Sequence, residues 1–162
     1  MDSARHANGQ VASRSAAIDV GVLDDSIGYL LRRAQVTVFQ RFFEVFAEVG
    51  LRPGQYSVLA VIERNPGLRQ TQLGDALGIK KANLVAMIDK LEERGLARRL
   101  PAANDRRSHA LHLTPRGSAL MVRLHRLNSR LDQRFSQVLG TDDRRRLCDA
   151  LRRISAQNGK PT

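Results

Sequence analysis

The sequence has one cysteine, Cys148, and no tryptophan among its 162 residues. A single thiol excludes an internal disulfide and a metal site built from several cysteines. No apolar run approaches the roughly 20 residues that span a bilayer. Three aspartates interrupt the one N-terminal stretch that a secretion signal would need, at Asp19, Asp24 and Asp25. We therefore expect a cytoplasmic protein with no membrane partner.

Aromatic and acidic residues are also scarce. Aromatic side chains make up 4% of the sequence, so aliphatic residues must form the core, which suits packed helices better than a β-sandwich. The chain has 16 Asp and Glu against 27 Lys and Arg, a formal net charge of +11. Such an excess favours a polyanionic partner, nucleic acid first and an anionic membrane surface second.

Metal-binding and catalytic patterns are missing. Two of the histidines, His109 and His112, would point to opposite faces of one strand, and the others, His6 and His125, stand alone. No paired carboxylates, glycine-rich phosphate loop or nucleophile elbow is present. The sequence thus predicts surface histidines, no metal, no cofactor and no enzyme.

Apolar residues recur every three or four positions through most of the chain, which is the helical period. The first helix is predicted from about Asp24 to Gly50 and carries two apolar stripes. Two stripes are more than one small core can bury, so we expect this helix to dimerise. A second helix is predicted over 53–64, with Pro53 in its first turn. The residues Asn65-Pro66-Gly67 then predict a turn.

The C-terminal part is also predicted to be helical. Thr114 and Pro115 supply a capping hydroxyl and a first-turn proline. The helix that follows has an apolar seam and ends at Gly140. The seam consists of Leu120, Leu124, Leu127, Leu131, Phe135 and Val138. A last helix begins at Thr141, with Leu147, Leu151 and Ile154 expected to face inward.

A helix-turn-helix register occupies residues 69–94, with helices predicted over 69–77 and 80–94. Gly74 stands where two backbones must approach, Gly78 suits a turn with positive φ, and Leu84 is placed to dock the second helix. The opposite face of that second helix is polar. Its predicted DNA contacts are Lys80, Lys81, Asn83 and Lys90.

The chemistry of that face fits DNA. Lysines at a helix N-terminus favour phosphate, and the Asn83 amide matches the edge of adenine. The alternative is that Lys80 and Lys81 only begin a solvated helix.

Two short alternating stretches after Gly95 predict a β-hairpin, the wing of a winged helix. Its basic tip includes Asp105, Arg106 and Arg107. An arginine there can enter the narrow minor groove, and Asp105 can hold the loop. An ordinary charged hairpin tip is the alternative.

At this point the chain resembles the MarR family of bacterial regulators, over roughly residues 25–156. Its order of short motifs carries the resemblance. They are Leu51-Arg52-Pro53-Gly54-Gln55-Tyr56, Asn65-Pro66-Gly67-Leu68, Gln72-Leu73-Gly74, Ile88-Asp89-Lys90-Leu91-Glu92-Glu93-Arg94-Gly95-Leu96, Asp105-Arg106-Arg107-Ser108 and Leu113-Thr114-Pro115-Arg116-Gly117.

The resemblance implies a homodimer whose first and last helices interlock, with paired winged domains on a pseudo-palindromic operator. It also implies a repressor that a small aromatic or anionic effector releases from DNA. By the family pattern Arg107 is the wing-tip arginine, Asp105 its structural companion and Arg106 a phosphate contact. Asp89 would tie the recognition helix to its surroundings.

The first helix resembles the part of the family that senses aromatic acids or their CoA thioesters. We accordingly predict effector contacts from Tyr29, Arg32, Arg33 and Tyr56. The alternative is that the tyrosines belong to the core and the arginines are solvated.

The chain departs from the family pattern at two helix starts and in the recognition helix. Arg52 and Arg69 replace the Ser or Thr that commonly caps the second and third helices, so these starts need another partner. Ala82 and Ala86 stand where many members have hydroxyl or arginine side chains, which leaves few groups to read bases.

The predicted fold class is mostly α, an α+β winged helix of six helices and a two-stranded wing, dimeric through its N- and C-terminal helices. The expected organisation is a flexible tail over 1–22, a dimerisation helix over 23–50, a winged helix-turn-helix domain over 51–114, C-terminal dimerisation helices over 115–157 and a tail over 158–162.

Two rival functions remain open. Arginines around Cys148 can lower a thiol pKa, which would make a redox-sensing regulator of the same fold. A buried packing cysteine is the simpler interpretation. The second rival is a basic protein that coats nucleic acid or membranes without sequence preference. A third rival, a small enzyme, is disfavoured because the sequence offers no nucleophile or acid–base pair.

Overall fold

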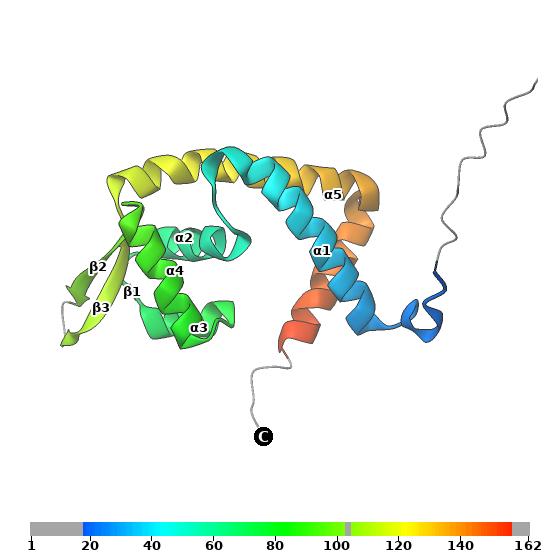
Figure 1. Cartoon of the computed structure of the whole chain (residues 1–162), viewed down its shortest axis with the longest axis horizontal. Helices are drawn as coiled ribbons and strands as arrows, with labels where there is room; N and C mark the ends of the chain where they lie inside the picture. The colour runs from blue at the N-terminus through cyan, green and yellow to red at the C-terminus, as the bar shows by residue number, and fades with distance from the viewer. Residues whose placement is uncertain (1–17, 103–104, 157–162) are drawn as a thin grey trace, which may run out of the picture. The chain divides into compact units, whose positions relative to one another are not determined.

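The computed structural model describes residues 18–102 and 105–156, and only the backbone at residues 102 and 105–108 (Figure 1). The predicted tails therefore lie largely outside the described residues, at 1–17 and 157–162. The chain forms two compact units, divided within the first helix between Val36 and Thr37.

Helices dominate the described residues, as predicted. They are α1 (Ile27–Phe46), α2 (Pro53–Arg64), α3 (Gln70–Leu77), α4 (Lys81–Glu93) and α5 (Pro115–Ala156), with short 3-10 turns at η1 (Gly21–Leu23) and η2 (Ala47–Val49). Gly50 ends the first helical stretch in the left-handed region (φ 57°), and Pro53 begins α2. The predicted helix–glycine–proline order at this junction is confirmed.

The sheet has three strands where two were predicted. β2 (Ala97–Ala102) and β3 (Asp105–Leu113) form the wing hairpin, and β1 (Leu68–Arg69) pairs with the other edge of β3. Leu68 lies opposite Leu111, and Arg69 lies opposite Ala110. Arg69 was expected to begin a helix. It instead keeps an extended backbone (φ −74°, ψ 147°) as the residue before α3, which lets it pair with β3.

Two glutamines replace the capping hydroxyls that α2 and α3 lack. The Arg52 backbone N–H donates to Gln55 Oε1 at 3.0 Å, and the Arg69 N–H donates to Gln72 Oε1 at 3.0 Å. Each glutamine occupies the third helical position, from which it can reach back over the first turn. The partner required at each helix start is therefore a glutamine three residues later.

The helix-turn-helix has the predicted close contacts. A Cβ at Gly74 would meet the Ile79 carbonyl oxygen and the Leu84 side chain at 3.3 Å. Gly78 ends α3 in the left-handed region (φ 61°), where glycine has no steric penalty. Leu84 is buried at the centre of the pair. The three residues act as the sequence predicted.

One hydrophobic core joins the end of α1, η2, α2, α3, α4, the sheet and the first half of α5. Its fully buried side chains are Phe46, Val58, Leu59, Ile62, Leu73, Leu84, Ile88, Leu91, Leu111, Met121 and Leu124. Only one of them is aromatic, in keeping with the composition. In this core α2 packs against α3, α4 and α5.

Helix α5 begins as predicted and bends where it was predicted to stop. The Gly117 N–H donates to Thr114 Oγ1 at 3.0 Å, and the Thr114 hydroxyl donates to the Gly95 carbonyl at 2.6 Å. Helical residues continue from Pro115 to Ala156, so the two expected C-terminal helices are joined. Gly140 alone is non-helical (φ 72°, ψ 170°) and produces a kink between them.

Several residues predicted to face inward are exposed in the single chain. Val138 at the end of the seam is 83% exposed, and Leu147, Leu151 and Ile154 are 37–44% exposed. Within the single chain, Leu147, Leu151 and Ile154 therefore do not face inward as expected. The first unit likewise exposes Ile27, Leu30 and Leu31 on α1. The first part of α1 and the last part of α5 therefore each leave apolar surface that another partner could cover.

Candidate nucleic-acid interface

Helix α4 presents one buried and one polar face. Leu84, Ile88 and Leu91 are buried in the core. The side chains on the other face are exposed: Lys80, Lys81, Asn83, Ala86 and Lys90. Lys80 is the extended residue before the helix (φ −58°, ψ 139°), so both lysines stand at the positive end of the helix dipole. This face offers cations and one amide to a polyanion.

An ion-pair clamp joins α4 to the wing. The Arg99 guanidinium on β2 lies 2.8 Å from Asp89 Oδ1 and also pairs with Glu92. The Arg99 backbone N–H donates to Glu92 Oε1 at 2.6 Å. The Arg99 side chain is only 20% exposed, so these charge-assisted bonds are partly shielded from water. The clamp fixes the angle between recognition helix and hairpin.

Asp89 thus has the structural position that the family pattern implied, but its partner Arg99 was missed. In the sequence, Leu96, Arg98 and Leu100 alternate as one face of the first predicted wing strand. Arg99 alternates instead with the buried Ala97, on the face of β2 turned to α4. The alternation of Ala97 with Arg99 is the sequence signal that could have identified Arg99 as the partner of Asp89.

The wing tip lies beyond what the structure describes. β2 and β3 pair with Pro101 opposite His109, and the register shifts between Pro101 and Ala102. The side chains of Asp105, Arg106 and Arg107 are outside the described residues. Their assigned contacts with DNA remain predictions.

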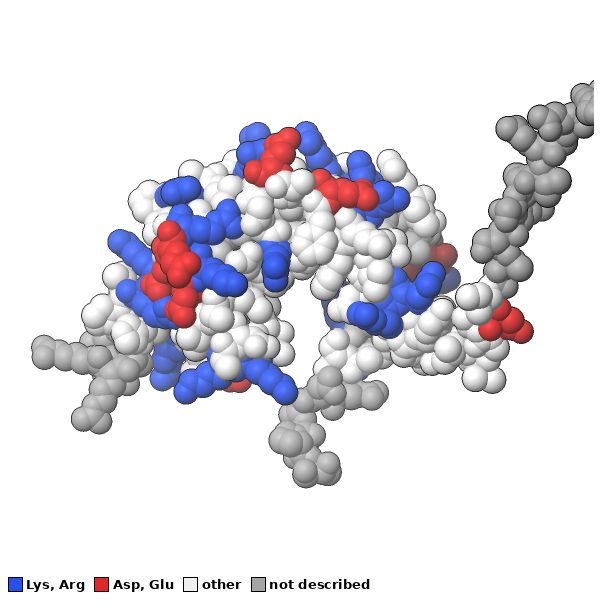
Figure 2. Space-filling view, viewed as in Figure 1, with Lys and Arg blue, Asp and Glu red and all other residues white. Residues whose placement is uncertain are grey.

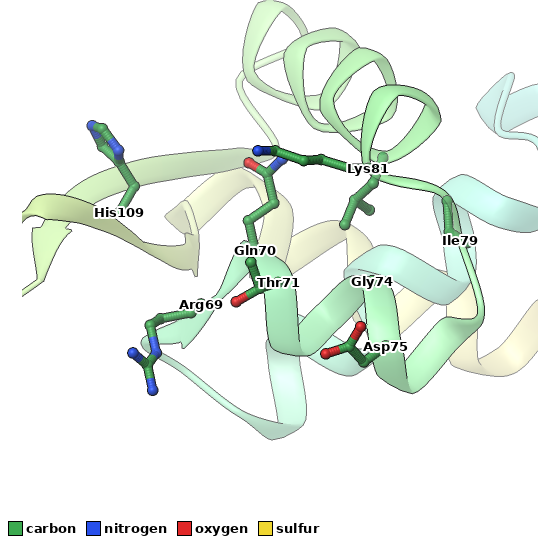
Figure 3. A pocket seen from close by; sticks show the side chains of 9 residues that line it. Arg69, Gln70, Thr71, Gly74, Asp75, Ile79, Lys81 and His109 are labelled. Carbon is green, nitrogen blue, oxygen red and sulfur yellow. The ribbon is translucent and has the colours of Figure 1, made fainter. Parts of the chain in front are cut away.

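A cavity of about 460 Å³ lies beside the start of α4 (Figure 3). Its lining comes from β1, α3, α4, β3 and the turn between α3 and α4: Arg69, Gln70, Thr71, Gly74, Asp75, Ile79, Lys81, Leu84 and His109. Figure 3 shows Gln70 and Lys81 reaching toward one another over the hollow, with His109 on its strand beyond them.

This cavity adds residues that sequence reasoning missed. Arg69, Thr71 and His109 surround it together with the predicted contact Lys81. Guanidinium, hydroxyl, imidazole and ammonium groups are donors that suit a phosphate oxygen. The sequence shows Arg69 only as a helix start without a capping hydroxyl. It predicts His109 only as a surface histidine, and the exposure of His109 confirms this. Strand pairing, invisible in the sequence, brings the two together.

A second cavity, of about 490 Å³, opens between the end of α1 and the recognition helix. Phe39 and Phe43 on α1 and Met87 on α4 give this cavity an apolar wall. Arg52 and Lys90 supply positive charge at its lining. The complete lining is Phe39, Phe43, Gly50, Arg52, Pro53, Gly54, Gln55, Ala86, Met87 and Lys90. We call this hollow the α1–α4 cavity.

The residues predicted to contact an effector are not in that lining. Tyr56 packs with Phe42 and Phe46, at ring-centre distances of 6.2 and 5.5 Å. Burial raises the pKa of Tyr56, and the carboxylates of Asp132 and Glu63 raise this pKa further. Tyr56 therefore behaves as a core residue.

The other three predicted contacts belong to the first compact unit. Arg32 and Arg33 are exposed there, and Tyr29 is half-buried. Their contact with an effector remains a prediction.

Other polar groups are ordinary parts of the surface. His125 pairs with Glu63 at 2.7 Å, and Cys148 is a half-buried free thiol. The described part of the chain has no group of three His, Cys, Asp or Glu that could hold a metal. No helix within 18–102 or 105–156 is both long and apolar enough to cross a membrane.

Comparisons with known proteins agree with this geometry. A sequence model of the MarR family matches residues 49–108. A relative from Thauera aromatica, named as a transcriptional regulatory protein for the hcr operon, is 33% identical over 157 residues, 96% of this chain and 95% of the relative.

Solved structures of the transcriptional repressor CouR are similar as well. CouR bound to a 23-mer DNA duplex has a TM-score of 0.81 and 42% identity, covering 85% of this chain and 98% of that one. CouR bound to p-coumaroyl-CoA has a TM-score of 0.79 and 40% identity, covering 85% and 97%.

Proposed function

Because the chain belongs to the MarR family of transcriptional regulators, we propose that it is a ligand-responsive repressor that binds a pseudo-palindromic DNA operator as a homodimer. In this proposal residues 51–114 bind DNA, and residues 23–50 and 115–157 dimerise. Such a protein works in the cytoplasm and needs neither a cofactor nor catalytic activity.

The observation that carries the DNA proposal is the exposed polar face of α4, beside the cavity lined by Arg69, Thr71, Lys81 and His109. Lys80, Lys81, Asn83 and Lys90 are all free to reach a duplex because Leu84, Ile88 and Leu91 fix the helix from behind. In a dimer the two recognition helices would enter successive major grooves, about 34 Å apart. Arg106 and Arg107 would reach the flanking backbone and minor groove.

The effector proposal rests on the α1–α4 cavity. Its aromatic and thioether wall fits a planar ring, and Arg52 and Lys90 fit a carboxylate or phosphate. CouR, which is similar over 85% of this chain, was solved with p-coumaroyl-CoA. We therefore assign the effector to the class of aromatic acids or their CoA thioesters.

Release of DNA follows from the position of Lys90. This residue lines the α1–α4 cavity and is also exposed on the polar face of α4 that we assign to DNA. An anion paired with Lys90 removes one phosphate contact, and a ring wedged against Met87 favours a position of α4 unsuited to DNA. The effector thus stabilises the state that does not bind the operator.

The DNA proposal is tested by fluorescence anisotropy on the operator at several salt concentrations. Lys81→Ala and Arg107→Ala should each weaken binding and lower the slope of log K against log salt by about 0.9 per subunit, about 1.8 for the dimer. Arg153→Ala, which removes an exposed arginine from the end of α5, is the control. Unchanged affinity and slope in both test variants would refute the assignment.

The effector proposal is tested with p-coumaroyl-CoA and free p-coumarate. Either compound should raise the melting temperature and release the operator. Arg52→Gln should weaken the response to the compound without altering operator affinity in its absence. If both compounds leave melting and DNA binding unchanged, the assigned effector class is wrong.

A further inference from the structure

A third hollow lies away from the DNA-binding elements, between the end of α1 with η2 and the first half of α5. Its volume is about 570 Å³. The residues that line it are Glu44, Val45, Glu48, Ala119, Val122, Arg123, Arg126, Leu127 and Arg130. None of them lines the α1–α4 cavity or the cavity beside α4. We call this hollow the α5 cleft.

The two carboxylates of the α5 cleft are already paired. Glu44 accepts from Arg41 at 2.9 Å, and Glu48 pairs with Arg123. Among the residues that the structure describes, neither Arg126 nor Arg130 has an ion-pair or hydrogen-bond partner. The α5 cleft therefore carries two uncompensated positive charges.

The spacing of these two arginines makes them one binding element. Positions four apart on a helix lie on the same face, about 5–6 Å between Cβ atoms. Like charges at that spacing destabilise a helix unless an anion bridges them. No carboxylate lies within residues 115–131 of α5 to compensate them locally. Two neighbouring guanidinium groups can grip one phosphate or carboxylate through several N–H donors.

The α5 cleft also has apolar surface. Val45 and Leu127 are half-buried against the core, and Val122 on α5 is 56% exposed. An exposed apolar side chain beside two unpaired arginines suits a ligand that has both an anionic group and an apolar group. Inorganic anions would use only the arginines, whereas a ring or short chain would also cover Val122.

We propose that the α5 cleft is a second ligand site, which takes a small organic anion with a phosphate or carboxylate head and an apolar group. Arg126 and Arg130 bind the head, while Val45, Val122 and Leu127 cover the apolar part. This site is separate from the α1–α4 cavity: α2 packs between α5 and α4, and the two cavities share no residue (Figure 1).

The charges at the α5 cleft favour a compact ligand over a nucleic acid. Figure 2 shows acidic and basic side chains interspersed along the upper surface of the molecule rather than one continuous basic track. Glu44 and Glu48 at the lining would repel a passing phosphate backbone. A single anionic head between Arg126 and Arg130 avoids both carboxylates.

The test is isothermal titration of the full chain with phenyl phosphate, benzoate and inorganic phosphate. Phenyl phosphate or benzoate should bind more tightly than inorganic phosphate, because only they cover the apolar residues. The double variant Arg126→Gln/Arg130→Gln should bind the organic anions at least about tenfold more weakly, a loss of about 1.4 kcal/mol. Binding by phenyl phosphate alone would identify a phosphate head, and binding by benzoate alone a carboxylate head.

The matched control is Arg134→Gln/Arg153→Gln, which removes the same charge from exposed positions on α5 outside the α5 cleft. It should bind the organic anions like the unchanged protein. Benzoate and phenyl phosphate are aromatic anions that the α1–α4 cavity of the proposed effector site can also take, so each titration is repeated in the Arg52→Gln background. Binding that remains in Arg52→Gln and is lost when Arg126→Gln/Arg130→Gln is added belongs to the α5 cleft. Far-UV circular dichroism verifies that each variant is folded.

Three results would overturn the proposal: no binding of either organic anion, equal loss of binding in the test and control variants, or loss only in Arg52→Gln. If the test variant instead loses affinity for the operator duplex, the surface is a DNA contact and not a ligand site. The operator experiment and the p-coumaroyl-CoA experiment use other ligands and readouts, so their results do not depend on the result for the α5 cleft.

Discussion

Gly117 is constrained by what it faces, although its backbone is ordinary helix. A Cβ at this position would overlap the backbone carbonyl of Leu96, where the start of α5 crosses the start of the wing. Gly117→Ala should therefore destabilise the protein by about 1–3 kcal/mol, because a backbone carbonyl cannot turn aside as a side chain can. Urea unfolding measures the loss.

The neighbouring Ser118→Ala is the control for Gly117→Ala. Ser118 is exposed and donates only its backbone N–H, to the Thr114 carbonyl at 2.9 Å. It should unfold like the unchanged protein. Equal stability of the two variants would mean that the helix start can move away from Leu96 without cost.

Tyr56 should make the protein sensitive to alkali. Burial, then Asp132 and Glu63, raises the pKa of this phenol above its ordinary value of 10.0. Above that pH the unfolded chain releases a proton that the folded chain retains, so stability is complete below pH 10 and falls as pH rises further. Tyr56→Phe should lose less stability between pH 8 and about pH 11.

The measurement for Tyr56 is the urea midpoint at each pH, with Tyr29→Phe as the control for the other tyrosine. A parallel decline of the Tyr56→Phe and unchanged proteins would show that another group titrates. Because Tyr56 contacts Phe42 and Phe46, the phenylalanine variant preserves the ring packing, and the comparison isolates the hydroxyl.

The sequence predicts the structural roles of some residues but not of others. Gly78, Thr114 and Leu84 could be assigned from the sequence because their roles depend on near neighbours along the chain. The steric reason for Gly117 could not, since Leu96 meets it only after the sheet has formed. The glutamine caps could have been predicted from the sequence, because Gln55 and Gln72 stand three residues after Arg52 and Arg69, which lack a capping hydroxyl.

At the scale of elements, the Arg99 clamp holds the wing against the recognition helix. Arg99→Gln removes the charge that pairs with Asp89 and Glu92, and it leaves two partly buried carboxylates without a cation. We expect a loss of about 1–2 kcal/mol in stability, since both pairs are charge-assisted but partly exposed. Operator affinity should also fall, because the wing no longer has a fixed angle to α4.

The adjacent Arg98→Gln is the matched control for stability, because Arg98 is exposed on the other face of β2. Thermal unfolding and anisotropy on the operator are measured for both variants. If Arg99→Gln proves as stable as Arg98→Gln, the clamp contributes nothing to the fold. A stable Arg99→Gln variant with weak DNA binding would assign the clamp to orientation alone.

Helices were easier to predict than strands for a physical reason. The 3.6-residue period of α1, α2 and α4 appears within a single stretch of sequence. β1 has only two residues, Leu68 and Arg69, and exists because β3 offers them an open edge. The cavity beside α4 depends on that pairing, so Arg69 and His109 could not be placed together from the sequence.

The whole molecule leaves apolar surface that its own core does not use. Leu147, Leu151 and Ile154 recur at helical spacing at the end of α5 and remain exposed. Ile27, Leu30 and Leu31 do the same in the first compact unit. A family of dimeric regulators gives such surfaces a partner in a second copy of the chain, and burial of several leucines would repay the entropy of association.

Leu151→Asp tests this assignment, because a carboxylate cannot be buried in an apolar interface without a partner. Sedimentation should detect monomers where the unchanged protein is dimeric, and operator binding should collapse since one recognition helix alone reaches only one half-site. Arg153→Asp places the same carboxylate on the opposite face of the helix, where it should leave the dimer intact. If Leu151→Asp remains dimeric, the exposed face of α5 is not the dimer contact, and the apolar residues of α1 become the surface to change next.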